Sequence, residues 1–230
     1  SHLRPAGGPP APRASGGPAW GERLVLVVVA IAGAREARRA AVDAVMVKGV
    51  AAIVERRASS PQPTERALKA RMARLAALEA AGLTVLPVRF GTAVQSAAEL
   101  RALLRPQADT LEEAIEQLRG RRQMTVRVRG ERTGLTRRTG VAYLKSLARA
   151  ARLPQADPFR KAVSSLVIDE RVEREARAGF AGTLHHLIDA ADAAPYRAAA
   201  AAVQRAHPRT FVVSGPTIPF AFVPGAAEPG

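Results

Sequence analysis

The run LVLVVVAIAG at residues 24–33 is the longest strongly apolar stretch in the chain, and it limits what the chain can fold into. It is too short to span a bilayer, because a membrane-spanning helix needs about 20 residues. Its β-branched residues favour a strand, and the absence of polar alternation means that both faces of that strand need cover. The run therefore predicts a central strand of a sheet with other elements packed on both sides.

The residues after this strand predict a mixture of helices and strands. A helix is expected at 34–46, and a second strand is expected in GVAAIVER at 49–56. SSPQPT at 59–64 is a loop of turn-forming residues, after which Thr64 can cap a helix that Gly82 ends. The apolar residues at helical spacing within that helix are Leu68, Met72, Leu75 and Leu78.

A third strand is expected in LTVLPVRF at 83–90. Pro87 cannot donate a hydrogen bond to a neighbouring strand, so this strand is predicted to lie at an edge of the sheet or to carry a bulge. Two short helices follow, because Ser96 with Glu99 and Thr110 with Glu113 have capping-box spacing; they are expected to end near Leu104 and Leu118. The first half is therefore predicted to mix α and β structure.

The second half opens with RRQMTVRVR at 121–129, a half-buried strand with a basic outer face. In that run the apolar residues Met124, Val126 and Val128 alternate with Thr125, Arg127 and Arg129. Two helices are expected after it, at 138–152 and 157–177, and the second starts at Asp157 and Pro158. They are followed by a strand at 179–189, a helix from Pro195 to Arg205, and a strand with an extended tail at 209–222. This order approximates a ferredoxin-like sandwich with an extra helix.

These patterns predict an α+β fold with two domains, an N-terminal mixed α+β domain and a C-terminal modified ferredoxin-like domain. Residues near the start of the chain are rich in Pro, Gly, Ala and Ser with almost no apolar periodicity, which is typical of a flexible tail. The expected bounds are 1–22 for this tail, 23–120 for the first domain, 121–224 for the second, and 225–230 for a second tail.

The charge and the missing cysteines limit the classes of partner and site. The formal net charge is +15, which attracts phosphate backbones, anionic membranes or an acidic protein, and charge alone does not choose among them. The sequence contains no Cys, which excludes disulfides and thiolate metal sites and makes a reducing cytoplasm the simplest location. No apolar run is long enough for a membrane span.

Candidate catalytic residues are few. His185 and His186 are adjacent, so on a strand they point to opposite faces and cannot both bind one metal without a bend. Asp189 and Asp192 have no nucleophile or second base nearby in the sequence, and SGPT at 214–217 is a common turn. We therefore expect no enzyme activity, no cofactor and no metal.

Three stretches together resemble the gas vesicle protein F/L family: TVLPVRFGT at 84–92, GVAYLKSLARA at 140–150 and FVVSGPTIPFAF at 211–222. The resemblance covers roughly residues 23–224. The first motif matches the family as a run, and the last departs from it at Thr217 and Ile218, where the family has Trp and Pro, and at Ala221. The matching residues are Leu86, Pro87, Arg89, Phe90, Gly91 and Thr92 in the first motif, and Gly215, Pro216, Pro219, Phe220 and Phe222 in the last.

The resemblance implies a non-enzymatic accessory protein that assists gas vesicle assembly. It implies chaperone-like binding of the small hydrophobic shell protein, with other gas vesicle accessory proteins as further partners, and a cytoplasmic, gas-vesicle-associated location. The alternative from another functional class is a nucleic-acid-binding module that uses the Arg-rich strand and loop at 121–138.

The residues expected to bind a partner come from three places. In TVLPVRFGT, interpreted as a strand end held at the domain junction, Arg89 needs an acidic or carbonyl partner if it is not solvated. The second place is the basic cluster formed by the Arg residues of 121–138. Its arginines form a solvated face, bind an acidic protein or bind phosphates. The C-terminal apolar residues either close the core, which is favoured for the two Phe residues, or leave a groove open for an amphipathic helix. The candidates are Arg89, Phe90, Arg127, Arg129, Arg132, Ile218, Phe220 and Phe222.

Overall fold

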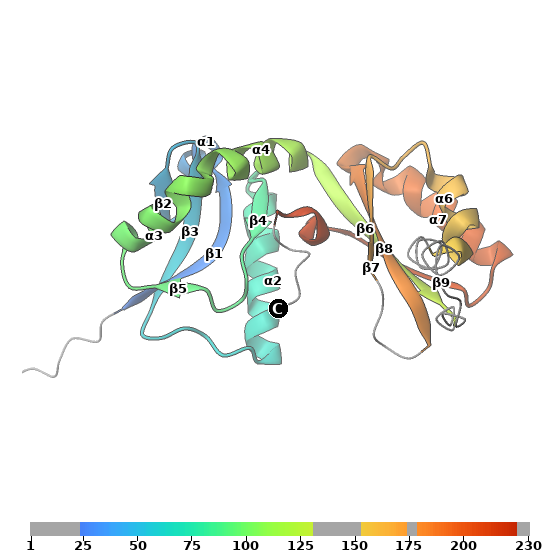
Figure 1. Ribbon diagram of the computed structural model, residues 1–230, viewed down its shortest axis with the longest axis horizontal. Coiled ribbons are helices and arrows are strands. Elements are labelled where there is room, and N and C mark those ends of the chain that lie inside the picture. The colour runs from blue at the N-terminus through green and yellow to red at the C-terminus, as the bar shows by residue number, and fades with distance from the viewer. Residues whose placement is uncertain (1–23, 131–152, 174–178, 225–230) are drawn as a thin grey trace, which may run out of the picture.

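The computed structural model describes residues 24–130, 153–173 and 179–224, which form two units, each built on an antiparallel sheet (Figure 1). The first unit contains β1 (Val25–Gly33), α1 (Ala34–Arg39), β2 (Ala44–Val47), β3 (Val50–Arg57), α2 (Glu65–Ala80), β4 (Val85–Pro87), β5 (Ala93–Val94), α3 (Ala97–Leu104), the 3-10 turn Arg105–Gln107 and α4 (Ala108–Leu118). The second contains β6 (Arg121–Arg129), the 3-10 turn Pro154–Ala156, α6 (Asp157–Val163), β7 (Asp169–Glu173), β8 (Phe180–Asp189), the 3-10 turn Ala190–Asp192, α7 (Ala193–Ala206), β9 (Phe211–Thr217) and the 3-10 turn Phe220–Phe222.

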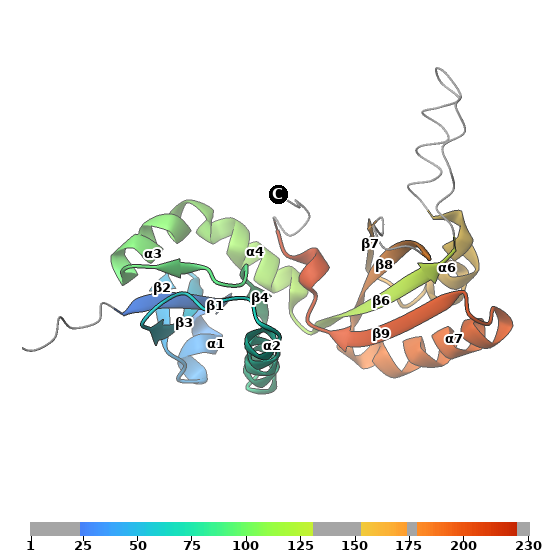
Figure 2. The same cartoon turned by 90° about the horizontal axis from the view of Figure 1, so that it is seen from below.

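Strand β1 is the centre of the first sheet, as its apolar run predicts. Every residue from Leu26 to Ala32 is buried. The strand order is β2-β3-β1-β4, with β5 also paired to β1. Helices α3 and α4 pack on one face of this sheet, and α1 and α2 pack on the other (Figure 2). The edge position predicted for the Pro87 strand is confirmed, because β4 ends the strand order.

The helix predicted at 34–46 is wrong. Helix α1 stops at Arg39, and the chain turns through Ala41, whose φ is 51°. Strand β2 then begins at Ala44 and pairs with β3. Its valines alternate, with Val45 and Val47 buried, so the period-two pattern and pairing with β3 prevail over helix formation here.

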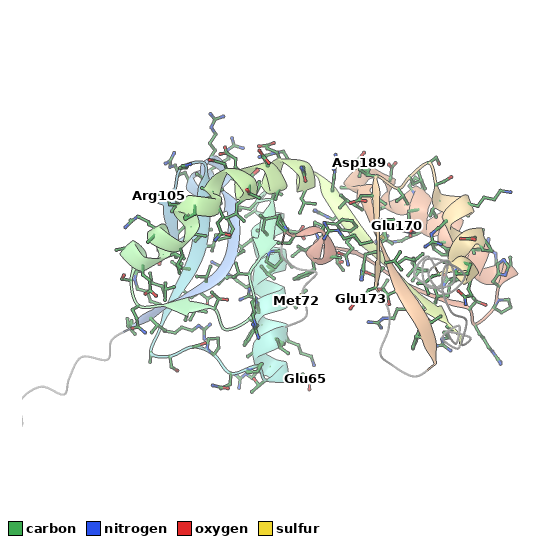
Figure 3. All side chains as sticks on the ribbon, in the orientation of Figure 1. Glu65, Met72, Arg105, Glu170, Glu173 and Asp189 are labelled. Atoms are coloured by element: carbon green, nitrogen blue, oxygen red, sulfur yellow. The ribbon has the colours of Figure 1, made fainter. Side chains whose placement is uncertain are left out.

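Helix α2 begins where its cap predicts. The Thr64 hydroxyl accepts a hydrogen bond from the Ala67 amide at 3.2 Å, and Gly82 follows the helix with φ +84°. Leu75 and Leu78 are buried, whereas Met72, labelled in Figure 3, is 46% exposed. Helical spacing therefore identified the helix but overstated how much of its apolar stripe is buried.

The two short helices after β5 are confirmed, but only one has the expected start. The Ser96 hydroxyl accepts from the Glu99 amide at 3.1 Å, so Ser96 caps α3. Helix α4 begins at Ala108, directly after the 3-10 turn, and not at the predicted Thr110 cap. The turn supplies an already helical chain, so no side-chain cap is needed there.

The second sheet has the order β7-β8-β6-β9 with every pair antiparallel. Along the chain, β6, α6, β7, β8, α7 and β9 give the β-α-β-β-α-β order of a ferredoxin-like domain. The helix predicted at 157–177 is wrong, because α6 ends at Val163 and β7 follows. Its sequence DERVE is that of a charged edge strand, which carries no apolar alternation to identify it. The predicted helix at 138–152 lies outside the described residues.

After β9, residues Ile218–Val223 return to the first sheet, and we call this segment the strap. Ile218 is 4% exposed and packs in the cluster that contains Leu75, while Phe222 is 6% exposed and packs in the cluster that contains Leu86. The strap belongs in sequence to the predicted second domain, 121–224, yet it completes the core of the first. The predicted domain bounds stay a prediction.

Candidate functional site

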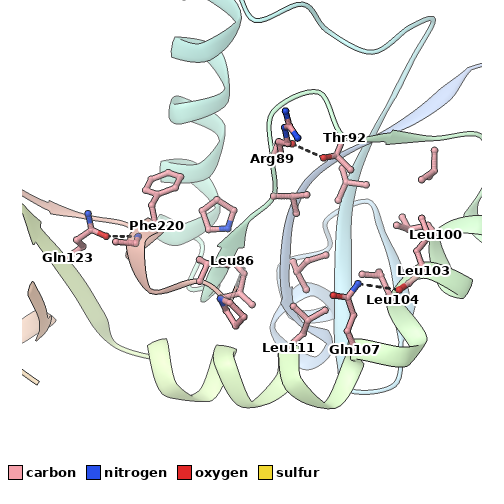
Figure 4. Close-up of a pocket in the computed structure, with 18 of the residues that line it drawn as sticks. Leu86, Arg89, Thr92, Leu100, Leu103, Leu104, Gln107, Leu111, Gln123 and Phe220 are labelled. Carbon is pink, nitrogen blue, oxygen red and sulfur yellow. Dashed lines mark hydrogen bonds between the residues drawn. The ribbon is translucent and has the colours of Figure 1, made fainter. Parts of the chain in front are cut away.

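A groove with a volume of about 950 Å³ lies where the first sheet, the α3–α4 pair, the strap and the second sheet meet (Figure 4). Apolar side chains form most of its surface, and polar side chains lie mainly at its ends. The apolar lining is Val28, Ile31, Leu86, Pro87, Val88, Val94, Leu100, Leu103, Leu104, Leu111, Phe220, Ala221, Val223 and Pro224, and the polar lining is Arg89, Thr92, Gln107, Gln123, Glu173 and His185. This groove is the candidate functional site.

The wall formed by α3 and α4 leaves apolar surface uncovered. Leu103 lines the groove and is 56% exposed, although Leu100 and Leu104 beside it are buried. The Gln107 amide donates to the Leu103 carbonyl at 3.2 Å, so the turn between the two helices is fixed at this point. A large exposed leucine at the rim of an apolar groove is typical of a surface that binds a partner.

The strand end in TVLPVRFGT is held by Arg71, which reaches it from α2. Strand β1 has a bulge at Val29, because Val28 pairs with Val54 and Ala30 pairs with Ile53, the residue just before Val54. The Arg71 guanidinium donates to the carbonyl of Val28 at 3.3 Å, to that of Val29 at 2.7 Å, and to that of Val88. One side chain thus joins the bulge of β1 to the chain leaving β4.

Arg71 positions this motif, and the sequence patterns did not single it out. Burial lowers the pKa of its guanidinium, and the charge of Glu55 opposes that effect in part. Its carbon Cζ lies 5.8 Å from the centre of the Phe90 ring, so Phe90 covers it from the loop side. The signal was available, since Ala67, Arg71, Leu75 and Leu78 share the inner side of α2 by spacing.

The Phe-Gly-Thr part of the motif forms a turn. Gly91 has φ +81°, a conformation that favours glycine, and its carbonyl accepts from the Ser60 hydroxyl at 2.7 Å. The Thr92 hydroxyl donates to the Arg89 carbonyl at 2.8 Å, and the Thr92 carbonyl accepts from the Val28 amide at 2.9 Å. The turn therefore returns the chain to β1 beside its bulge, at one end of the groove.

Arg89 itself is exposed and lines the groove. In the part of the chain that the structure describes, no carboxylate lies within ion-pair distance of it. Because the side chain is exposed, its charge is solvated, and Arg89 does not need the acidic or carbonyl partner that a buried arginine would need. Its role in binding a partner stays a prediction, as does that of Phe90, which is half-buried against Arg71.

Polar groups of the second sheet hold the strap in place. The Ala221 amide donates to Gln123 Oε1 at 2.9 Å. Arg171 donates to the Ala221 carbonyl at 2.5 Å, and its guanidinium lies 5.2 Å from the centre of the Phe222 ring. Phe222 and Ile218 thus close the core, whereas Phe220 is half-buried and lines the groove. Whether these three residues contact a partner stays a prediction.

Gln123 also fixes the hydrogen bonding of His185 at the end of the groove. Because its Oε1 accepts from the Ala221 amide, the Gln123 Nε2 group faces His185 Nδ1 at 3.1 Å and donates to it. The remaining ring nitrogen, Nε2, then carries the proton and donates to Glu173 Oε2 at 3.1 Å. Both nitrogens of His185 therefore have hydrogen-bond partners, which fix the orientation of its ring.

His186 points to the opposite face of β8, as its adjacency to His185 predicts. It is 1% exposed, its Nδ1 lies 2.6 Å from the Tyr196 hydroxyl, and its Nε2 lies 2.9 Å from Glu170 Oε2. Arg160 donates to both Glu170 oxygens at 3.0 Å. This cluster lies between the sheet and its helices and does not reach the groove.

The cluster changes the acidity of its members. Burial raises the pKa of the Glu170 carboxyl, but hydrogen bonds from His186 and Arg160, with the positive charge of Arg160, outweigh burial and lower that pKa to about 2. Burial and the nearby Glu170 charge raise the pKa of Tyr196. Glu170 and Glu173 are labelled on β7 in Figure 3, and their partners lie on opposite faces of the sheet.

The Glu170 cluster is expected to make stability depend on pH. The pKa of Glu170 falls from 4.5 to about 2 on folding, so its contribution is complete above pH 4.5 and is lost as the pH falls towards 2. Chemical denaturation of the wild type and of Glu170→Gln should therefore differ most at neutral pH and converge near the folded-state pKa. Glu65→Gln, at a carboxyl that is 81% exposed, is the control and should follow the wild type at every pH. A constant difference between wild type and Glu170→Gln would contradict the prediction.

Two of the predicted basic residues lie on the exposed face of the second sheet. Arg127 and Arg129 are exposed, and Arg129 lies 5.8 Å from the centre of the Phe180 ring. Arg132 lies outside the described residues. The structure thus places Arg127 and Arg129 near each other on β6 and apart from Arg89, which lies across the groove on the first unit. Their part in binding stays a prediction.

The described ranges contain neither a cluster of metal-binding side chains nor a helix that could span a membrane. Within 24–130, 153–173 and 179–224, no three His, Asp or Glu side chains gather where they could hold a metal ion. None of the helices in these ranges is both long and apolar enough to cross a membrane. The groove therefore remains the candidate binding site within these ranges.

Comparison with known proteins gives a family match and two structural matches. The model of the family described as "Gas vesicle synthesis protein GvpL/GvpF" matches residues 28–224. The crystal structure of gas vesicle protein GvpF from a species of Anabaena has a TM-score of 0.63 and 16% identity, and the match covers 87% of this chain and 94% of that one. The structure of GvpF from Microcystis aeruginosa has a TM-score of 0.63 and 15% identity over 79% and 88%. No curated protein matches the sequence. At these identities the structures establish a shared fold.

Proposed function

Because the chain belongs to the GvpL/GvpF family of gas vesicle synthesis proteins, we propose that it assists gas vesicle assembly by binding the hydrophobic shell protein in a chaperone-like way, without catalysis. Other gas vesicle accessory proteins are further candidate partners, and the cytoplasm and the gas vesicle itself are the expected places of action. The observation that carries the proposal is the apolar groove of about 950 Å³ between the two units.

The proposed mechanism is reversible occlusion of apolar surface. The groove offers apolar side chains from three directions, namely the face of the first sheet, the α3–α4 pair and the strap. In this mechanism an apolar helix face or an extended segment of the shell protein enters the groove. Its apolar surface and that of Leu103 are then both buried away from water. The shell protein is thereby shielded from aggregation until it is released.

The chemistry of the groove supports binding and not bond-making. Its ionisable members are Arg89, Glu173 and His185. Both nitrogens of His185 are engaged by Gln123 and Glu173.

The decisive substitution is Leu103→Asp. It places a charge at the rim of the groove, and we expect the affinity for the shell protein to fall by about ten- to a hundred-fold, which corresponds to losing the contact of one leucine side chain. Because Leu103 is 56% exposed, the free energy of unfolding should stay nearly unchanged. Co-expression with the shell protein, followed by co-purification and a binding titration, measures the effect.

Leu68→Asp is the matched control. Leu68 is 44% exposed, similar to Leu103, but it lies on α2 on the other side of the first sheet. It should leave binding unchanged. Equal binding by Leu103→Asp and the wild type, or a larger loss in Leu68→Asp, would show that the groove is not the site.

A further inference from the structure

One face of the second sheet carries no helix within the described part of the chain, and we call it the open face. Helices α6 and α7 pack on the other face, against Met124, Val126 and Val128. Phe159 of α6 and Tyr196 of α7 lie in one buried cluster with these three residues. The alternate side chains of β6 point to the open face; these are Gln123, Thr125, Arg127 and Arg129.

The open face continues directly from the groove. Gln123, His185 and Glu173 line the groove, and Thr125 pairs with His185 across β6 and β8. The next position on this face of β6 is Arg127, which pairs with Thr183. Side chains on one face of a strand are about 7 Å apart, so Arg127 lies about 7 Å beyond Thr125 and Arg129 about 14 Å beyond it.

The far part of this face carries positive charge. Within the described part of the chain, no carboxylate lies within ion-pair distance of Arg127 or Arg129, whereas Arg122 of the same strand pairs with Glu79 at 2.9 Å. A third exposed cation, Arg209, precedes Thr210 in the chain, and the Thr210 carbonyl accepts from the Arg129 amide at 2.8 Å. Glu173 is the nearby acid, and His185 already engages it.

We propose that the polypeptide bound in the groove continues as an acidic stretch over the open face, where its carboxylates pair with Arg127 and Arg129. This inference rests on the groove binding proposed above and adds the chemistry of the partner. The partner segment has an apolar part for the groove and, roughly two to four extended residues further along, Asp or Glu for the arginines. Complementary charge of this kind fixes the direction in which a segment lies.

An acidic polypeptide fits this surface better than a nucleic acid does. Single-stranded nucleic acids bind sheet faces by stacking bases on free aromatic rings. On the described part of the open face, Arg129 already covers the ring of Phe180. The adjoining groove is apolar, which suits side chains of a polypeptide and not a phosphate backbone.

The test uses the full chain and two synthetic amphipathic helical peptides with the same leucine-rich body. One peptide ends in an oligo-glutamate stretch and the other in an oligo-glutamine stretch. Fluorescence anisotropy at low and high salt measures both affinities. At low salt the wild type should prefer the glutamate peptide by about ten-fold, and the preference should vanish at high salt, because exposed ion pairs are screened.

Arg127→Glu with Arg129→Glu should abolish the preference for the glutamate peptide and leave the affinity for the glutamine peptide unchanged. The matched control is Arg38→Glu with Arg39→Glu, which changes the net charge equally at exposed positions of α1 on the other side of the first unit. This control should keep the preference.

The outcomes separate this inference from the proposed function. Binding of both peptides with equal affinity, unaffected by the Arg127 and Arg129 changes but lost in Leu103→Asp, overturns the inference and leaves the groove as the site. Binding that Leu103→Asp does not affect overturns the proposed function. If the Arg127 and Arg129 changes abolish binding of an oligo-dT strand and leave the peptide preference intact, the open face is a nucleic-acid surface and the inference is wrong.

Discussion

Replacing Arg71 by alanine is expected to lower the free energy of unfolding by about 3 kcal/mol, because hydrogen bonds from a charged donor contribute about 1.5–3 kcal/mol. Three carbonyls, those of Val28, Val29 and Val88, lose their guanidinium donor together. The bulge of β1 and the chain after β4 then have no common partner. Urea denaturation followed by circular dichroism measures the loss.

Two further substitutions separate the causes of this loss. Arg71→Met keeps much of the aliphatic contact and removes the donors, so it should be nearly as unstable as Arg71→Ala. Arg71→Lys keeps the charge but lacks the planar group that reaches several carbonyls, and it should recover only part of the stability. Arg66→Ala, on the exposed side of α2, is the control and should change stability by less than about 0.5 kcal/mol. A similarly small loss in Arg71→Ala would mean that α2 does not hold the strand end.

Phe222→Ala is expected to cost about 3–5 kcal/mol, the usual effect of removing a buried Phe side chain. Phe222 is 6% exposed within the first core, and the Arg171 guanidinium covers its ring. Its loss should also free the strap, so the Ala221 amide, which Gln123 now holds, should exchange its hydrogen faster. Thermal denaturation and hydrogen exchange measure the two effects.

Phe220→Ala is the control for the strap. Phe220 is half-buried at the groove, so its removal should cost clearly less stability than that of Phe222. If Phe220→Ala costs as much as Phe222→Ala, or if both cost less than about 1 kcal/mol, the strap does not anchor the two units in the way that its burial indicates.

Much of the fold could be predicted from the sequence because local patterns agree with the final packing. Strand β1 is an unbroken apolar run, β6 alternates, and Thr64 caps α2, and each signal needs only neighbouring residues. Strands β2 and β7 were missed for the opposite reason. Both are short edge strands that pair with the next strand of the chain, β3 for one and β8 for the other: the four residues of β2 give too little alternation to outweigh a helix, and DERVE in β7 gives none. The family resemblance was confirmed over most of the chain.

Less of the candidate site could be predicted. The motif 84–92 was expected to be a strand end at the domain junction, and the structure places it beside the strap and the groove. The residue that holds it, Arg71, lies in a segment whose spacing was interpreted through its apolar residues alone. The groove was offered only as an alternative to core closure, because its walls come from β4, the α3–α4 pair and the strap, which are far apart in the sequence.

The strap has a consequence for the order in which the protein is made. Translation proceeds from the N-terminus, so the ribosome polymerises β1 to α4 first, then all of the second sheet, and the strap after both. Phe222 and Ile218 therefore cannot cover the first unit while the second is still being synthesised. During that interval the nascent polypeptide carries an unfinished apolar core, so the first unit reaches its final packing only after translation has passed the strap.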